Sequence, residues 1–256
     1  MPRRVKAVSH EDQLSLVEHL DELRSRIVVC AVVFGVALAL CFWQNHLLLE
    51  IAGGPLPDGH KKLITFGVTE PFTTTITVAA YGAIILSMPI VLYQLYAYVL
   101  PAFSPHERRA VLPILLLFPI LFLAGIAFAY FAVMPAAVKF LLSFNDTQFN
   151  IQVRARDYYS FFSTTMLAGA LVFQLPLAIL AVVRLGIVRI DQLTSNRRYA
   201  YLAIAIIAAA LPGVDPVSMI IEMVPLLVLF ELSILLARVL GRPGESGGVA
   251  EPTTQE

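Results

Sequence analysis

The run VLPILLLFPILFLAGIAFAYFAVM (Val111–Met134) decides the fold class of this 256-residue chain. No charged side chain interrupts it, and it is longer than the about 20 apolar helical residues that cross the hydrocarbon core of a bilayer. A membrane β-strand would instead alternate in polarity at every second residue. The run therefore predicts a transmembrane α-helix, in which the backbone satisfies its own hydrogen bonds.

The composition extends this conclusion to the whole chain. Charged residues make up 14% of the sequence and hydrophobic residues 58%, with a mean hydropathy of +0.79, whereas about a quarter of the residues of a soluble domain are charged. Prolines in the apolar runs should bend the helices. The expected fold class is all-α, a polytopic membrane protein built as a bent bundle of six transmembrane helices, at Ile27–Trp43, Thr73–Tyr96, Val111–Met134, Tyr159–Val183, Tyr199–Leu211 and Val217–Ala237.

The distribution of basic residues predicts the orientation of the bundle. Of the 18 Lys and Arg residues, 13 lie in the N-terminal segment, the second and fourth connections and the C-terminal tail. Cytoplasmic loops carry the excess of Lys and Arg. We therefore expect both termini in the cytoplasm. The first 26 residues are polar and lead straight into a full-length span, so we expect no cleaved signal peptide.

Three regions follow from this pattern. Residues 1–26 form a cytoplasmic N-terminal segment, residues 27–237 the six-helix domain, and residues 238–256, rich in Gly, Pro, Ser and Thr at their end, a disordered cytoplasmic tail. The fifth span, Tyr199–Leu211, would rise only about 20 Å as a helix. Either it starts earlier, with arginines snorkelling, or the bilayer thins around it.

Two acidic motifs lie on the predicted cytoplasmic side, HLDELR (His19–Arg24) and HERR (His106–Arg109). Each also has a structural interpretation. Glu22 precedes Arg26 by four residues, the favourable order for an ion pair on a helix surface. The run from Ser104 to Glu107 matches a capping box with Pro at the first helical position, which would start a helix.

Several segments together resemble the TatC family, the C subunit of the twin-arginine protein translocase. They are HLDELRSR before the first span, YQLYAYVLPAFSPHERR (Tyr93–Arg109), FQLP in the fourth span and LPGVDP (Leu211–Pro216), in the family's order over nearly the whole chain. The resemblance implies a receptor in the bacterial cytoplasmic (inner) membrane. It would bind the signal peptides of folded proteins and export them with the proton-motive force.

The resemblance also implies site residues and partners. The glutamates of the two motifs, here Glu22 and Glu107, are implicated in recognising the paired arginines of the signal peptide. Arg24 and His106 belong to the same motifs, and Leu20, Tyr98 and Phe103 are apolar neighbours that would receive the rest of the peptide, unless they are only interface anchors. The implied partners are twin-arginine signal peptides, TatA- and TatB-type single-span subunits, the lipid bilayer and further copies in a receptor complex.

Polar groups inside the predicted spans form a second set of candidates, because such groups are costly in lipid. Glu222 and Glu231 lie nine residues apart, on opposite faces of a helix, so we expect two sites. Gln174 occupies a position where many family members carry glutamate, and an amide cannot titrate. Asp215 matches an acidic position of the family, but Asp before Pro216 is also what a helix N-cap needs.

Other function classes rank lower. A secondary transporter, the alternative, would need intramembrane carboxylates that meet at mid-bilayer, and the opposed faces of Glu222 and Glu231 argue against it. An enzyme would need a nucleophile with a base or a metal-binding cluster, and the sequence offers neither HExxH nor a nucleophile elbow. We expect no catalytic residues, no metal and no cofactor. The formal net charge of zero gives no reason to expect nucleic acid as a partner.

Overall fold

The computed structural model describes residues 10–99, 105–184, 188, 190–211 and 215–240. These residues are helical apart from loops and one isolated β-bridge between Ile64 and Arg154. The helices are α1 (His10–Trp43), α2 (Asn45–Gly53), α3 (Glu70–Val99), α4 (Pro105–Phe128), the π-helix η3 (Ala129–Val133), α5 (Met134–Ser143), α6 (Ala155–Val172), α7 (Leu175–Arg184), α8 (Ile190–Ser195), α9 (Arg197–Ala210) and α10 (Pro216–Leu240), with a 3-10 turn, η1 (Asp58–His60).

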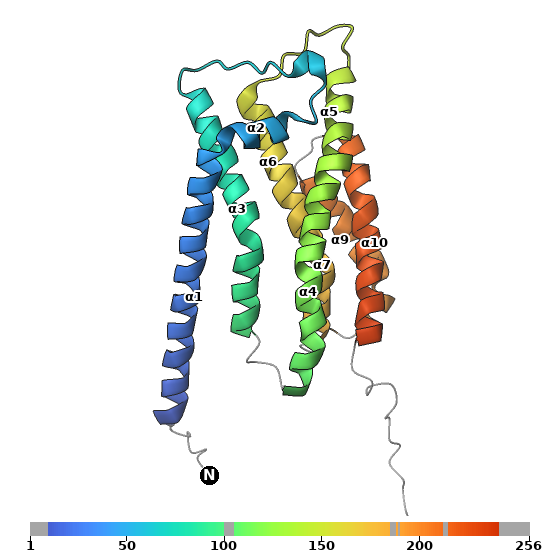
Figure 1. The fold of residues 1–256 in the computed structure, drawn as a ribbon. Coiled ribbons are helices and arrows are strands. Elements are labelled where there is room, and N and C mark those ends of the chain that lie inside the picture. Colours follow the sequence, from blue (N-terminus) through green and yellow to red (C-terminus); the bar gives the residue numbers. More distant parts are fainter. Residues whose placement is uncertain (1–9, 100–104, 185–187, 189, 212–214, 241–256) are drawn as a thin grey trace, which may run out of the picture.

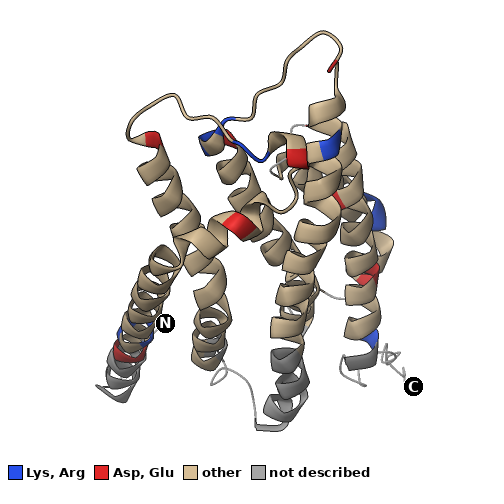
Figure 2. Cartoon of the chain, turned by 45° about the horizontal axis from the view of Figure 1, so that its top comes forward, with Lys and Arg blue, Asp and Glu red and all other residues tan. Residues whose placement is uncertain are grey.

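The long helices stand side by side in the predicted six-helix membrane bundle. In Figure 1, α1 and α3 form one end of the bundle, α4 and α5 stand in the middle, and α10 stands at the other end with α9 beside it. The start of α1, the end of α3 and the end of α10 lie at the bottom, and the connections after α2 and α5 lie at the top. Charged residues gather mainly towards these two ends, with long apolar stretches between them (Figure 2).

The six predicted spans are present, including the short fifth one, and their bounds differ from the prediction mainly in the first and third. Among the described residues, five helical segments are long and apolar enough to cross a membrane. The remaining crossing is α9, whose 14 residues rise only about 21 Å. It packs Ile204 and Ala208 against Leu226 and Phe230 of α10. A disordered tail is expected over residues 238–256, but the last helix runs to Leu240, so the first three of these residues are helical. Residues 241–256 lie outside the described residues.

The third span is longer than predicted and contains a π-helix. The helix continues past Met134 to Ser143 through η3. Pro135 has no backbone N–H, so the carbonyl four residues earlier loses its ordinary helical donor, and the chain widens into a π turn just before it. The π turn also carries Tyr130, whose hydroxyl donates to the carbonyl of Ile51 in α2, at 3.0 Å.

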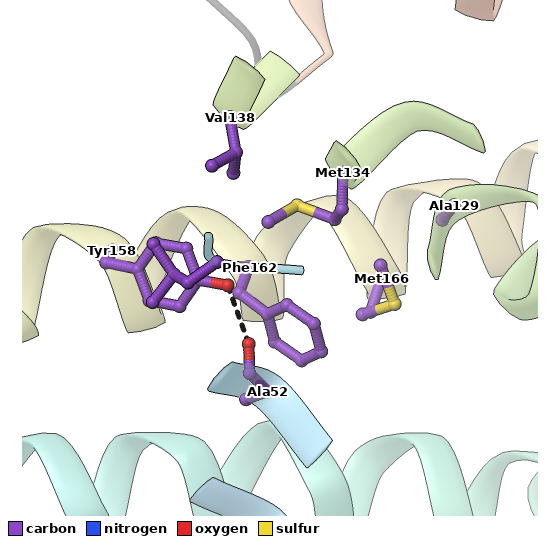
Figure 3. Close-up of a cluster of buried hydrophobic side chains, with 8 residues drawn as sticks. Ala52, Ala129, Met134, Val138, Tyr158, Phe162 and Met166 are labelled. Carbon is purple, nitrogen blue, oxygen red and sulfur yellow. Dashed lines mark hydrogen bonds between the residues drawn. The ribbon is translucent and has the colours of Figure 1, made fainter. Parts of the chain in front are cut away.

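A buried cluster fastens α2 across the top of the bundle. Met134, Tyr158, Phe162 and Met166 pack around Ala52 (Figure 3). The hydroxyl of Tyr158 donates to the carbonyl of Ala52 at 2.6 Å. The carbonyl of Ile51 also accepts from the backbone N–H of Gly54. The two tyrosines bind carbonyls near the C-terminus of α2 and hold it against the third and fourth spans.

Candidate functional site

The first candidate site lies where the start of the first apolar span meets the end of α3. Arg26 of α1 forms an ion pair with Glu22, one helical turn earlier, with Nε donating to Oε1 at 3.1 Å. The predicted surface ion pair is therefore confirmed. The side chain of Glu22 is 37% exposed and that of Arg26 22% exposed, so the pair is partly withdrawn from water.

Arg26 also reaches across to α3. Its Nη1 donates to Oε1 of Gln94 at 3.0 Å, and its Nη2 donates to the carbonyl of Ala97 at 3.3 Å. The guanidinium is thus held by a carboxylate, an amide oxygen and a helix carbonyl at once. Each of these groups is an acceptor, so the pocket they form is chemically suited to a planar cation with several N–H donors.

The other predicted residues of the signal-peptide site differ in how exposed their side chains are, and the structure does not describe all of them. Leu20 is 62% exposed, Arg24 is exposed and Tyr98 is half-buried. His106 and Glu107 lie in the first turn of α4, which begins at Pro105 as the capping-box pattern predicts, but their side chains lie outside the described part of the chain. Phe103 also lies outside it.

Gln94 was not among the predicted site residues. A signal for it exists, because it is a lone amide between Tyr93 and Leu95 near the end of an apolar span, and polar groups at such depth usually have a partner. Its partner, Arg26, lies 68 residues earlier in the sequence, so only the packing of α1 against α3 identifies the pair.

The polar groups inside the membrane occupy separate places, as expected. The fourth span breaks between α6 and α7 at Phe173 and Gln174. Both polar atoms of the Gln174 side chain are buried and have no hydrogen-bond partner among the described residues. Such a group costs free energy unless something pairs with it.

The acidic residues near and within α10 have different environments. Asp215 caps the helix, because its Oδ1 accepts from the backbone N–H of Ser218 at 2.8 Å. Glu222 is buried, with 8% of its surface exposed. Glu231 accepts from the hydroxyl of Tyr201 at 2.6 Å and pairs with Arg197 at 3.1 Å. Capping by Asp215 is confirmed, and the carboxylates of Glu222 and Glu231 do not share one site.

The described residues contain no cluster of three or more His, Cys, Asp or Glu side chains arranged to hold a metal ion. The chemistry that this arrangement offers is recognition. A partly desolvated carboxylate next to an amide and a helix end can select guanidinium groups, and a buried amide in a broken span can accept a polar group from a neighbouring helix.

Comparison with known proteins agrees with this description. Residues 18–225 match the family described as Sec-independent protein translocase protein (TatC). The protein of that name from Carboxydothermus hydrogenoformans is 35% identical over 236 residues, which cover 92% of this chain and 97% of the relative. The protein TatCy of Bacillus subtilis is 31% identical, covering 94% of this chain and 95% of the relative.

Two solved structures are similar over most of the chain. A crystal structure described as the twin-arginine translocase receptor TatC is 32% identical, with a TM-score of 0.74, covering 88% of this chain and 100% of that one. A crystal structure of the receptor in DDM is also 32% identical, with a TM-score of 0.75, covering 85% and 98%.

Proposed function

This chain belongs to the TatC family of Sec-independent protein translocase proteins, and on that premise we propose that it is the receptor that binds twin-arginine signal peptides at its cytoplasmic face. It is a multi-pass membrane protein and a component of a protein translocase. In the proposed role, residues 27–237 form the translocase domain, which assembles with single-span subunits and exports folded proteins with the proton-motive force.

The observation that carries the proposal is the environment of Arg26. Its guanidinium is bound by Glu22, Gln94 and the end of α3, so the acceptors at this corner suit a guanidinium, and a signal-peptide arginine would share them with Arg26 or displace it. A fully exposed ion pair contributes only about 0–1 kcal/mol, and partial burial of Glu22 strengthens the attraction. Binding of a twin-arginine peptide, compared with a twin-lysine peptide, to the purified chain tests the proposal.

Glu107 is proposed as the second carboxylate, for the second arginine of the peptide. It follows α3 in the sequence by one short connection and begins α4, so it belongs to the same end of the bundle as Glu22 (Figure 1). The exposed side chain of Leu20, together with Tyr98 and Phe103, would receive the apolar part of the peptide. Arg24 and His106, which belong to the same two motifs, are proposed as further members of the signal-peptide site.

The proposed contact with TatA- and TatB-type subunits involves the polar groups in the membrane. The amide of Gln174 is buried without a partner among the described residues, and a polar side chain of a single-span helix would satisfy it. The α9 helix, which packs on α10, is short and carries the Tyr201 and Arg197 groups that bind Glu231. Self-association in a receptor complex is proposed on family grounds alone.

The proposed topology can be tested by cysteine labelling. With Cys30 and Cys41 replaced, single cysteines at Asp58 and Gln148 should react with an impermeant reagent added outside intact cells, because these loops lie opposite the chain's N-terminal end (Figure 1). A cysteine at His10 should react only after the membrane is opened. Outside labelling at position 10 would refute the assignment of the N-terminus to the cytoplasm.

The short fifth span gives a second test. Inserting four leucines into α9 adds about 6 Å of helix and turns its end by only about 40°, so the face that packs on α10 is nearly preserved. If the short helix thins the bilayer locally, the insertion should impair export of a folded reporter and leave peptide binding nearly intact.

The matched control for this insertion keeps the length of the helix constant. Ala203 and Ala209 are exposed on α9, and replacing both with leucine adds apolar surface without lengthening the span. Export by this control should equal that of the wild type. Full export by the lengthened variant would remove local thinning from the mechanism.

A further inference from the structure

The connection between α2 and α3 and the starts of α3 and α6 enclose a cavity at the end of the bundle opposite Glu22. Its volume is about 590 Å³, and its wall includes Glu70, Thr74, Arg154, Arg156 and Tyr159. The apolar segments containing α3 and α6 begin at Glu70 and Ala155. The cavity therefore opens at the level where the membrane begins, and Thr77 in its wall lies about 10 Å deeper along α3.

Arg154 and Glu70 of the cavity wall form an ion pair with each other. Arg154 donates through Nε and Nη2 to the two carboxylate oxygens of Glu70, at 2.9 and 3.1 Å, and this hydrogen bonding raises the pKa of Arg154. Glu70 also accepts from the backbone N–H of Phe66 at 3.0 Å. The carboxylate is thus fully occupied, and Arg154 is fixed further by stacking over the ring of Phe66 at 5.3 Å.

Thr73 and Thr77 of the wall donate to carbonyls of their own helix, but three other donors of the wall have no acceptor among the described residues. Arg156 is exposed and forms no hydrogen bond or ion pair with any described residue. The Oγ1 of Thr74 is buried and unpartnered, in a residue only 6% exposed. The hydroxyl of Tyr159 likewise has no acceptor among the described residues. Buried polar groups are normally hydrogen-bonded, so the hydroxyl of Thr74, together with Arg156 and Tyr159, suits a ligand that brings acceptor oxygens.

The net charge of the cavity wall also favours a ligand with acceptor oxygens, and one that is negatively charged. Two guanidinium groups face one carboxylate in the cavity wall, which leaves one positive charge there. Asp157, in the first turn of α6, lies outside the wall. Phe66 and Val68 beside the mouth are 74% and 101% exposed, which is unfavourable in water and favourable next to acyl chains. We propose that this cavity binds a phosphate-ester anion, supplied by the headgroup of an anionic phospholipid in the leaflet opposite the peptide site.

The proposal is tested with the purified full-length chain and short-chain lipids. Native mass spectrometry should detect one tightly held molecule of dioctanoyl-phosphatidylglycerol, with a lower affinity for dioctanoyl-phosphatidylcholine. Arg156→Gln should raise the dissociation constant for the anionic lipid about 10- to 100-fold, because one charge-assisted hydrogen bond is lost. Lys62→Gln, which removes an equal charge from the same end of the protein outside the cavity wall, should leave it unchanged.

A second variant distinguishes loss of the ligand from loss of the fold. Thr74→Val removes the unpartnered hydroxyl, so the ligand-free protein should unfold at the same temperature or a higher one, while the affinity for the anionic lipid falls. Equal affinity for the two lipids, or a wild-type affinity in Arg156→Gln, would overturn the proposal. If inorganic phosphate displaces the lipid at similar concentration, the site binds a soluble oxyanion and the lipid source is wrong.

Discussion

Replacing Glu22 or Glu107 with alanine is expected to weaken binding of a twin-arginine peptide by about 2–5 kcal/mol, because a peptide guanidinium would be left partly desolvated without its carboxylate. For Glu22 the loss should lie towards the lower end. In the ligand-free chain its carboxylate is already paired with Arg26, so part of the attraction to the peptide is offset by breaking or sharing that pair. The measurement is a titration of the purified, folded variants with labelled peptide.

Asp21 provides the matched control for Glu22. It belongs to the same motif and the same end of α1 and is exposed, so Asp21→Ala removes an equal charge and should change the affinity by less than about 1 kcal/mol. If Glu107 only caps α4, its removal would lower the stability by about 0.5–2 kcal/mol without changing the affinity. Wild-type affinity in both single variants would mean that the two glutamates are structural.

The two peptide arginines extend the same test. Replacing them with lysine should cost less than removing their charge, since Coulomb attraction remains when the bidentate geometry is lost. If each arginine pairs with one glutamate, a double-mutant cycle between receptor and peptide should give a large coupling for the matched pair and a small one for the mismatched pair. Equal coupling energies for all four glutamate–arginine pairs would mean that each arginine interacts with both glutamates rather than with one.

The sequence predicts features of this fold that depend on short stretches of chain. The six apolar runs, the short fifth span, the start of α4 at Pro105 and the cap of α10 at Asp215 follow from length, composition and turn chemistry over a few residues. The pair between Glu22 and Arg26 belongs to the same class, because four residues on a helix fix the distance between two side chains.

Features that depend on the packing of distant segments were missed. Three such features join residues far apart in the sequence. They are the hydrogen bond between Arg26 and Gln94, the ion pair between Arg154 and Glu70, and the hydrogen bonds from Tyr130 and Tyr158 to α2. The end of the third span was also placed too early, at Met134. A proline at position 135 normally stops a helix, and here the π turn of η3 lets the helix continue instead.

Replacing Gly125 with alanine is expected to destabilise the bundle by about 1–3 kcal/mol, the usual cost of overpacking a filled interior. At this position a Cβ would lie 2.5 Å from the carbonyl oxygen of Gly169 and 3.0 Å from the Cα of Ala170. These are backbone atoms of α6 and cannot rotate away. With Ala129, the two glycines form a contact of small residues that brings α4 and α6 together, as in many membrane helix pairs.

Gly35→Ala is the matched control, because it makes the same substitution inside another membrane helix. A Cβ at Gly35 meets nothing within 4 Å, so alanine there should be neutral or stabilise α1 by up to about 1 kcal/mol through its higher helix propensity. In the same detergent, the thermal unfolding midpoint of Gly125→Ala should therefore fall below that of the wild type, while that of Gly35→Ala should equal or exceed it. Gly125→Leu should lower it further, since the larger side chain forces the helices apart. An unchanged or higher midpoint for Gly125→Ala would mean that α4 and α6 do not cross at backbone contact in the membrane protein.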